Sequence, residues 1–121
     1  MTGKARILVK RIYDDPTPQD GSRILVDRLW PRGLSKDGAN IDEWRKDVAP
    51  SAELRKWYGH DPERYDEFAA RYRDELDAAP DALNDLRDRA RSGVLTLLTA
   101  TKDVEHSQAA VLAGVLAEPA S

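Results

Sequence analysis

The sequence has 121 residues, the size of a single domain that can bury its own core without a disulfide or a structural metal. It contains no cysteine and two histidines, which excludes thiol catalysis, iron–sulfur clusters and His-rich metal centres. The net charge is −3 and the pI about 5.4, unlike the basic domains that bind nucleic acid. We therefore expect one domain over residues 1–121, with no metal, no cofactor and no nucleic acid partner.

The charge is unevenly distributed along the chain. Residues 1–36 carry eight Lys or Arg against four Asp, so the rest of the chain holds the acidic excess. No apolar run approaches the roughly 18–20 residues of a membrane span, and the first fifteen residues are too polar for a signal peptide. We expect a cytoplasmic protein with no membrane contact and with a local site for an anion near its basic N-terminal part.

Three short aliphatic runs predict strands that are buried on both faces. They lie at residues 5–12, 24–26 and 94–98, each close to Gly or Pro. The loop between the first two contains two Pro and three Asp, and it is shorter than the dozen or so residues of an ordinary parallel crossover. Whether these two strands are neighbours in the sheet is left open.

Helical signals fill the middle and the end of the chain. Asp61-Pro62 is typical of a helix start, and an apolar face recurs from Tyr65 to Leu76. A second helix follows Asp81 and ends before Gly93, and Ser51 can cap a short helix upstream. The spacing further predicts a helix start at 40–44 and a last helix from about residue 105. The order of elements predicts one three-layer α/β domain, with a small, mostly parallel sheet of three or four strands and helices on both faces.

A first candidate site follows the second predicted strand, in the segment 26–33. Asp27 and Arg28 should emerge at the carboxyl end of that strand, where open α/β sheets bind ligands. Arg28 and Arg32 can present guanidinium forks to a phosphate or a carboxylate, and Asp27 can orient an arginine or act as a base. The alternative is a structural Asp–Arg pair that holds the loop while Trp30 packs on the core.

A second candidate site follows the third predicted strand. Lys102 and the free amides of the next helix would form an anion-binding corner, with Thr101 as a hydroxyl donor. The segment lacks the Gly-rich run of a nucleotide-hydrolysing loop, and a simple capped turn is the alternative. Arg11 is a further cation for the anion, and Tyr13 and Ser51 are candidate hydrogen-bond donors.

Two functions from different classes fit these residues. The first is a small-molecule site at the carboxyl edge of the sheet that binds an anionic group; if it is catalytic, hydrolysis or transfer at a phosphate or carboxyl-derived group is the natural class. Whether it is an enzyme is left open. The second is a non-catalytic module that binds a protein partner through a patch of Trp, Tyr and Arg, built from Trp30, Trp44, Trp57 and Tyr58.

Four segments resemble one known family. They are RIYD (11–14), DGSRILVDRLWPRG (20–33), DEWRKDVAPSAELRKW (42–57) and the LTLL…K…A..L pattern within 95–112. Over nearly the whole chain the sequence is similar to the short, YeaO-like branch of the bacterial family called domain of unknown function 488. The resemblance implies an α/β cytoplasmic protein of unassigned activity, in which Asp27-Arg28 corresponds to an Asp-x-Arg-like motif of longer relatives. Their Cys-rich segment is absent here, and Thr99 and Ser107 stand where short relatives often have Tyr and Asn.

Overall fold

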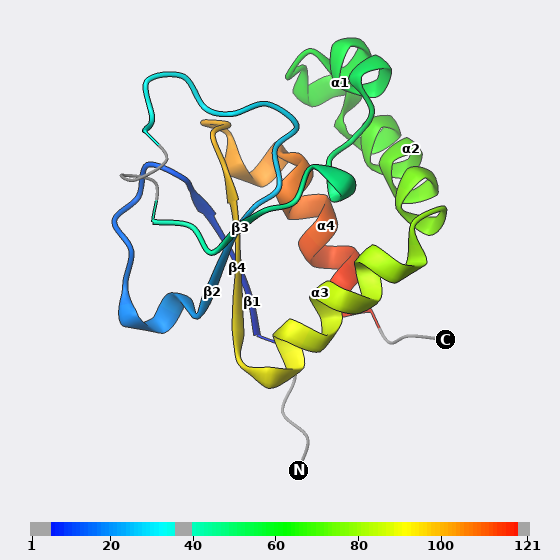
Figure 1. The fold of residues 1–121 in the computed structure, drawn as a ribbon. Helices are drawn as coiled ribbons and strands as arrows, with labels where there is room; N and C mark the ends of the chain where they lie inside the picture. Colours follow the sequence, from blue (N-terminus) through cyan, green and yellow to red (C-terminus); the bar gives the residue numbers. More distant parts are fainter. Residues whose placement is uncertain (1–5, 36–39, 119–121) are drawn as a thin grey trace.

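The computed structural model describes residues 6–35 and 40–118. Its centre is a parallel sheet of four strands in the order β1-β4-β2-β3 (Figure 1). The strands are β1 (Arg6–Arg11), β2 (Ser22–Leu25), β3 (Glu43–Trp44) and β4 (Val94–Thr99). The first two strands are not neighbours, because β4 lies between them and pairs with both. The predicted α/β class and the parallel sheet are confirmed.

The described residues also form four α-helices, which are α1 (Ala52–Tyr58), α2 (Tyr65–Asp77), α3 (Pro80–Ser92) and α4 (Gln108–Ala117). A 3-10 turn precedes three of them: η2 (Lys46–Val48) before α1, η3 (Pro62–Arg64) before α2 and η4 (Val104–His106) before α4. The hydroxyl of Ser51 caps α1 as predicted, accepting the amide of Leu54 at 3.1 Å. The last helix begins slightly later than predicted, where the hydroxyl of Ser107 accepts the amide of Ala110 at 3.2 Å. None of the described helices has the length and apolarity to cross a bilayer.

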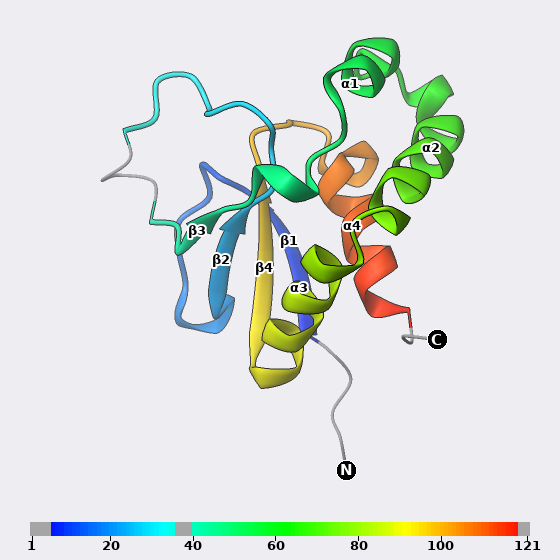
Figure 2. The same ribbon diagram turned by 45° about the vertical axis from the view of Figure 1, so that its right-hand side comes forward.

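The main core lies between the sheet and the helices. Leu95 and Leu97 of β4 are fully buried there, together with Tyr72 of α2, Leu86 of α3 and Leu112 of α4. Both views show the four helices gathered on this side of the sheet (Figures 1 and 2). Because side chains alternate along a strand, the neighbouring residues of β4 face the other side.

The opposite face of the sheet corrects one expectation. We expected helices on both faces, but here side chains of the segment after β2 pack on the sheet, and this segment forms no helix in its described part. Trp30 and Leu34 of this segment pack on Leu25 and Leu98. Pro31 and Gly33 interrupt the segment, and its apolar side chains supply the cover that a helix would otherwise give.

The predicted helix start at 40–44 is also wrong. Glu43 and Trp44 form the short edge strand β3, which pairs with β2. The Glu43 carboxylate accepts a hydrogen bond from Arg89 of α3 at 2.9 Å, and the Trp44 indole donates to the carbonyl of Asp27 at 2.8 Å. These long-range contacts replace the local capping interactions that the pattern suggested.

The crossover from β1 to β2 contains the 3-10 turn η1 (Pro18–Asp20) and is fixed by a buried charge cluster. The Asp20 carboxylate accepts from Lys10 at 2.6 Å, from Thr17 and from Arg23, and it is 1% exposed. The Asp20 carbonyl accepts the hydroxyl of Thr96 of β4 at 2.6 Å. The crossover is therefore held to β1 through Lys10 and to β4 through Thr96.

Candidate functional site

The candidate site lies where β2 and β4 end. The two strands run parallel with Leu25 opposite Leu98, so the residues that follow them reach the same edge of the sheet. A pocket of about 240 Å³ opens between the loop after β2, the turn after β4 and the region of α1. Its lining consists of Asp27, Arg28, Leu29, Trp30, Pro31, Pro50, Arg55, Tyr58, His60, Phe68, Ala100, Thr101 and Gln108. This is the position at which open α/β sheets bind ligands.

Asp27 holds this edge of the sheet together. One carboxylate oxygen accepts the amide of Ala100 at 2.7 Å, and the other accepts the side-chain amide of Gln108 at the start of α4. Burial raises the pKa of Asp27, and the hydrogen bonds from Ala100, Thr99 and Gln108 oppose that rise. The predicted structural alternative, an ion pair with Arg28, is not formed. Asp27 instead joins the end of β2 to the end of β4 and to α4.

Two arginines give the pocket positive charge. Arg28 comes from the loop after β2, and Arg55 comes from α1. Both residues are exposed, and neither side chain makes a hydrogen bond or ion pair within residues 6–35 and 40–118. Guanidinium groups without a protein carboxylate are available to a bound anion.

His60 reaches the pocket through an unusual turn. Gly59, which ends α1, and His60 both have left-handed backbone conformations, with φ of 54° and 57°. Residues other than Gly seldom adopt such a φ, and Asn, Asp and His are enriched among those that do. The turn brings His60 beside Tyr58, with ring centroids 6.2 Å apart, and places an imidazole in the lining of the pocket.

Aromatic rings form the apolar part of the pocket. Tyr58 stacks on Phe68 with ring centroids 4.2 Å apart, and its hydroxyl donates to the carbonyl of His106 at 2.6 Å. Burial raises the pKa of Tyr58 to about 12, so the hydroxyl stays protonated. The indole N–H of Trp30 donates to the carbonyl of Leu34 at 2.6 Å. The polar atoms of Trp30 and Tyr58 are thus occupied, and these residues offer a ligand mainly their ring surfaces.

The sequence-predicted residues fall into separate places. Asp27, Arg28 and Thr101 line the pocket. Lys102 is exposed on the same turn as Thr101 but does not line the pocket. Ser51 has a structural role, because its hydroxyl caps α1 and donates to the Glu75 carboxylate at 2.6 Å.

The remaining predicted residues form a second group at the carboxyl end of β1. The Arg11 guanidinium lies over the ring of Tyr13 at 5.1 Å, and the Tyr13 hydroxyl donates to the carbonyl of Arg32 at 3.4 Å. None of these three lines the pocket. The structure therefore separates the predicted cations into Arg28 in the pocket and Arg11, Arg32 and Lys102 outside it.

Sequence reasoning missed Arg55 and His60. A short helix capped by Ser51 was predicted, but no local signal indicates that it lies over the ends of β2 and β4. The GH pair at 59–60 hints at a turn, since Gly favours a left-handed backbone. The direction of that turn depends on the packing of Tyr58 against α2.

The tryptophans of the predicted partner patch are all half-buried and engaged with other side chains. Trp30 and Trp44 meet edge to face with centroids 5.2 Å apart. Trp57 lies under the guanidinium groups of Arg64 and Arg71, at 5.4 and 4.6 Å. A protein partner on this patch stays a prediction.

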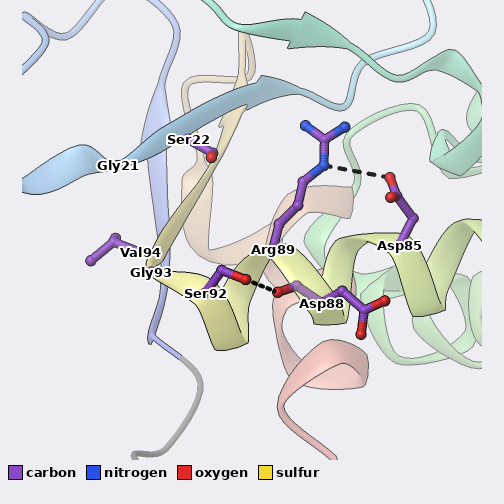
Figure 3. Close-up of a pocket in the computed structure, with 8 residues that line it drawn as sticks. All are labelled: Gly21, Ser22, Asp85, Asp88, Arg89, Ser92, Gly93 and Val94. Atoms are coloured by element: carbon purple, nitrogen blue, oxygen red, sulfur yellow. Dashed lines mark hydrogen bonds and ion pairs between the residues drawn. The ribbon is translucent and has the colours of Figure 1, made fainter.

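A second pocket, of about 350 Å³, lies at the opposite edge of the sheet, at the amino ends of β2 and β4 (Figure 3). Its acidic groups are already engaged: Asp85 pairs with Arg45 and Arg89, and Asp88 with Arg91. Within the described residues, no group of three or more His, Cys, Asp or Glu is placed to hold a metal ion. The amino edge thus offers less available charge than the carboxyl edge.

The fold and the pocket define a small α/β protein with an open parallel sheet and a basic, aromatic pocket at its carboxyl edge. Residues 6–121 match the family DUF488-N3i, described as "Inactive DUF488-N3 subclade", and the chain belongs to this family. It is 53% identical over 117 residues to the uncharacterized proteins Rv3073c of Mycobacterium tuberculosis and Mb3100c of Mycobacterium bovis, covering 96% of this chain and 98% of each relative.

A more distant relative is the uncharacterized protein YeaO of Escherichia coli. It is 43% identical over 107 residues, which cover 88% of this chain and 93% of that protein. The resemblance read from the sequence motifs is therefore confirmed. No solved structure matches the chain.

Proposed function

We propose that the pocket at the carboxyl edge of β2 and β4 binds a small anionic molecule, and that the protein acts by binding rather than by catalysis. One observation carries this proposal: Arg28 and Arg55 line a pocket in which neither has a protein counter-charge among the described residues. The carboxylate that shares the pocket, Asp27, is engaged by Ala100 and Gln108. The family resemblance makes the cytoplasm the expected compartment.

Two findings support binding without turnover. The family to which the chain belongs is described as an inactive subclade. Asp27, the candidate base, uses both carboxylate oxygens to hold the chain at Ala100 and Gln108. A general base has to reach the proton that it abstracts, and these scaffold contacts compete with that role.

The proposal is tested by calorimetric titration with three anions: inorganic phosphate, phenyl phosphate and benzoate. The wild type is compared with Arg28→Ala and with Arg32→Ala, an exposed arginine on the same loop that does not line the pocket. We expect Arg28→Ala to weaken binding about 10-fold or more, because the charge-assisted hydrogen bonds to the anion are lost. Arg32→Ala should leave the affinity unchanged.

Three outcomes would contradict this proposal. Absence of binding of all three anions at millimolar concentration would remove the anion site. An equal loss in Arg28→Ala and Arg32→Ala would show a general charge effect rather than a site. Conversion of phenyl phosphate during long incubation, followed by NMR and lost in Asp27→Asn, would make the protein an enzyme.

A further inference from the structure

We infer that the ligand of this pocket is a phosphate monoester in its dianionic form, carried on a small apolar group and held between Arg28 and Arg55. The inference rests on the proposed anion site and adds to it the ligand class and a role for Arg55 in selecting a dianion. No feature of the sequence assigned Arg55 to the site, and its place there is known only from the structure.

The two arginines reach the pocket from different parts of the fold. Arg28 lies in the loop after β2, whereas Arg55 lies in the middle of α1, a helix that is capped by Ser51 and anchored on α2 through Glu75. The Glu75 carboxylate accepts both the amide of Ser51 at 2.8 Å and its hydroxyl at 2.6 Å. The position of Arg55 is therefore set by the scaffold, and an anion in the pocket can contact the two guanidinium groups from two directions.

The charge of the pocket favours a dianion over a monoanion. Arg28 and Arg55 line the pocket with one carboxylate, that of Asp27, which is half-buried and accepts hydrogen bonds from Ala100 and Gln108. A monocarboxylate can satisfy one guanidinium fork, whereas a phosphate monoester presents three acceptor oxygens and about two negative charges to both.

The remaining walls describe the rest of the ligand. Trp30, Tyr58 and Phe68 line the pocket with Pro31 and Pro50, so the part of the ligand away from the phosphate meets rings and aliphatic carbon. The volume of about 240 Å³ lies below the roughly 300–1,000 Å³ of pockets for drug-sized molecules. One ring or a short apolar group beside the phosphate therefore suits the space better than a larger molecule.

The test separates charge from shape with two matched ligands at pH 8. Phenyl phosphate is then a dianion, because phosphate monoesters have a second pKa near 6, and phenyl methyl phosphate is a monoanion of similar shape. We expect the wild type to bind phenyl phosphate about 10- to 100-fold more tightly than the methyl ester. In Arg55→Gln this preference should fall to less than about 3-fold.

Two further variants control the comparison. Lys56→Gln removes a neighbouring exposed charge of α1 that does not line the pocket, and it should keep the full preference. Arg55→Lys should keep part of it, because an ammonium group retains the charge but loses the guanidinium fork. Far-UV circular dichroism and urea unfolding establish that each variant folds, as expected for substitutions at exposed positions.

The outcomes distinguish this inference from the proposed function. If both esters bind equally well and Arg28→Ala weakens both, the anion site stands and the dianion assignment is wrong. If Lys56→Gln lowers the preference as much as Arg55→Gln, then the effect is the general charge of α1 and not a contact of Arg55. If neither ester binds to the wild type, both proposals fail together.

Discussion

Two carboxylates, the half-buried Asp27 and the buried Asp20, lie at opposite ends of the sheet, and their surroundings shift their pKa values in opposite directions. Asp27 lies at the carboxyl edge, where burial raises its pKa. Asp20 lies in the crossover before β2, where the hydrogen bond from Lys10, aided by Thr17 and Arg23, holds its pKa well below the usual range despite burial. The difference follows from the partners: amides and a hydroxyl surround Asp27, whereas two cations hold Asp20.

The lowered pKa of Asp20 makes a prediction about acid stability. A carboxyl group whose pKa is lower in the folded state stabilises the protein above its unfolded pKa of about 4, and this contribution is lost as the pH falls towards the folded pKa. Asp20→Asn leaves Arg23, which is 5% exposed, without its charged partner, and should cost roughly 3–5 kcal/mol at pH 7. The difference from wild type should narrow steadily between pH 4 and pH 2.

Urea unfolding at pH 7, 4 and 2.5 measures this difference. Asp15→Asn, at an exposed position of the same crossover, is the control and should change stability little at any of the three pH values. A gap between wild type and Asp20→Asn that is the same at pH 7 and pH 2.5 would show that the charge of Asp20 does not stabilise the fold.

At the scale of elements, the approach of the crossover to β4 depends on Gly21. Its φ is +61°, and a Cβ built there would lie 2.2 Å from the carbonyl oxygen of Val94, a backbone atom that cannot turn aside. Gly21→Ala should therefore destabilise the protein by roughly 3–5 kcal/mol, from the left-handed backbone and the overlap together. Gly33→Ala is the matched control, with φ +74° and no atom within 4 Å of the added Cβ.

The control isolates the steric part of the effect. Gly33→Ala should cost about 1–2 kcal/mol, the penalty of the left-handed backbone alone. Both variants are compared by urea unfolding at pH 7. Similar losses in the two would mean that β4 and the crossover separate easily and do not pack tightly at Gly21.

Elements with local signals were predicted well, and elements that depend on distant partners were not. The strands β1, β2 and β4 are continuous aliphatic runs, and α1 has its cap at Ser51, so each is readable within a few residues. The strand β3 consists of Glu43 and Trp44 alone and exists because β2 pairs with it. The cover of the second face likewise depends on where Trp30 packs, which the sequence of its loop does not specify.

The candidate site divides in the same way. Asp27 and Arg28 were predicted because they follow a buried strand, and the parallel pairing of β2 with β4 brought Thr101 beside them. Lys102 follows β4 as closely as Arg28 follows β2, but it lies one residue beyond Thr101 on the turn and does not line the pocket. Arg55 belongs to the site through the packing of α1 on α2, which no pattern within α1 itself reveals.

At the scale of the whole molecule, the pocket joins two parts of the chain that are far apart in the sequence, the loop after β2 and the region of α1. The loop after β2 packs on the sheet through Trp30, whereas α1 packs on α2 through Tyr58 and Phe68. A ligand held by Arg28 and Arg55 would connect them. Segments that bind ligands are usually among the less stable parts of a fold, so the connection should be visible in their local opening.

Hydrogen–deuterium exchange should therefore show coupled protection. Saturation with phenyl phosphate should slow the amide exchange of residues 27–30 and of α1 together, because the ligand stabilises the state in which both are in place. The carboxyl-terminal turn of α3, near Ser92 at the opposite edge, is the internal control and should not change. In Arg55→Gln the protection of α1 should be lost while that of residues 27–30 persists. Protection that appears in α1 and not in 27–30, or equally in α3, would contradict a ligand held between the two arginines.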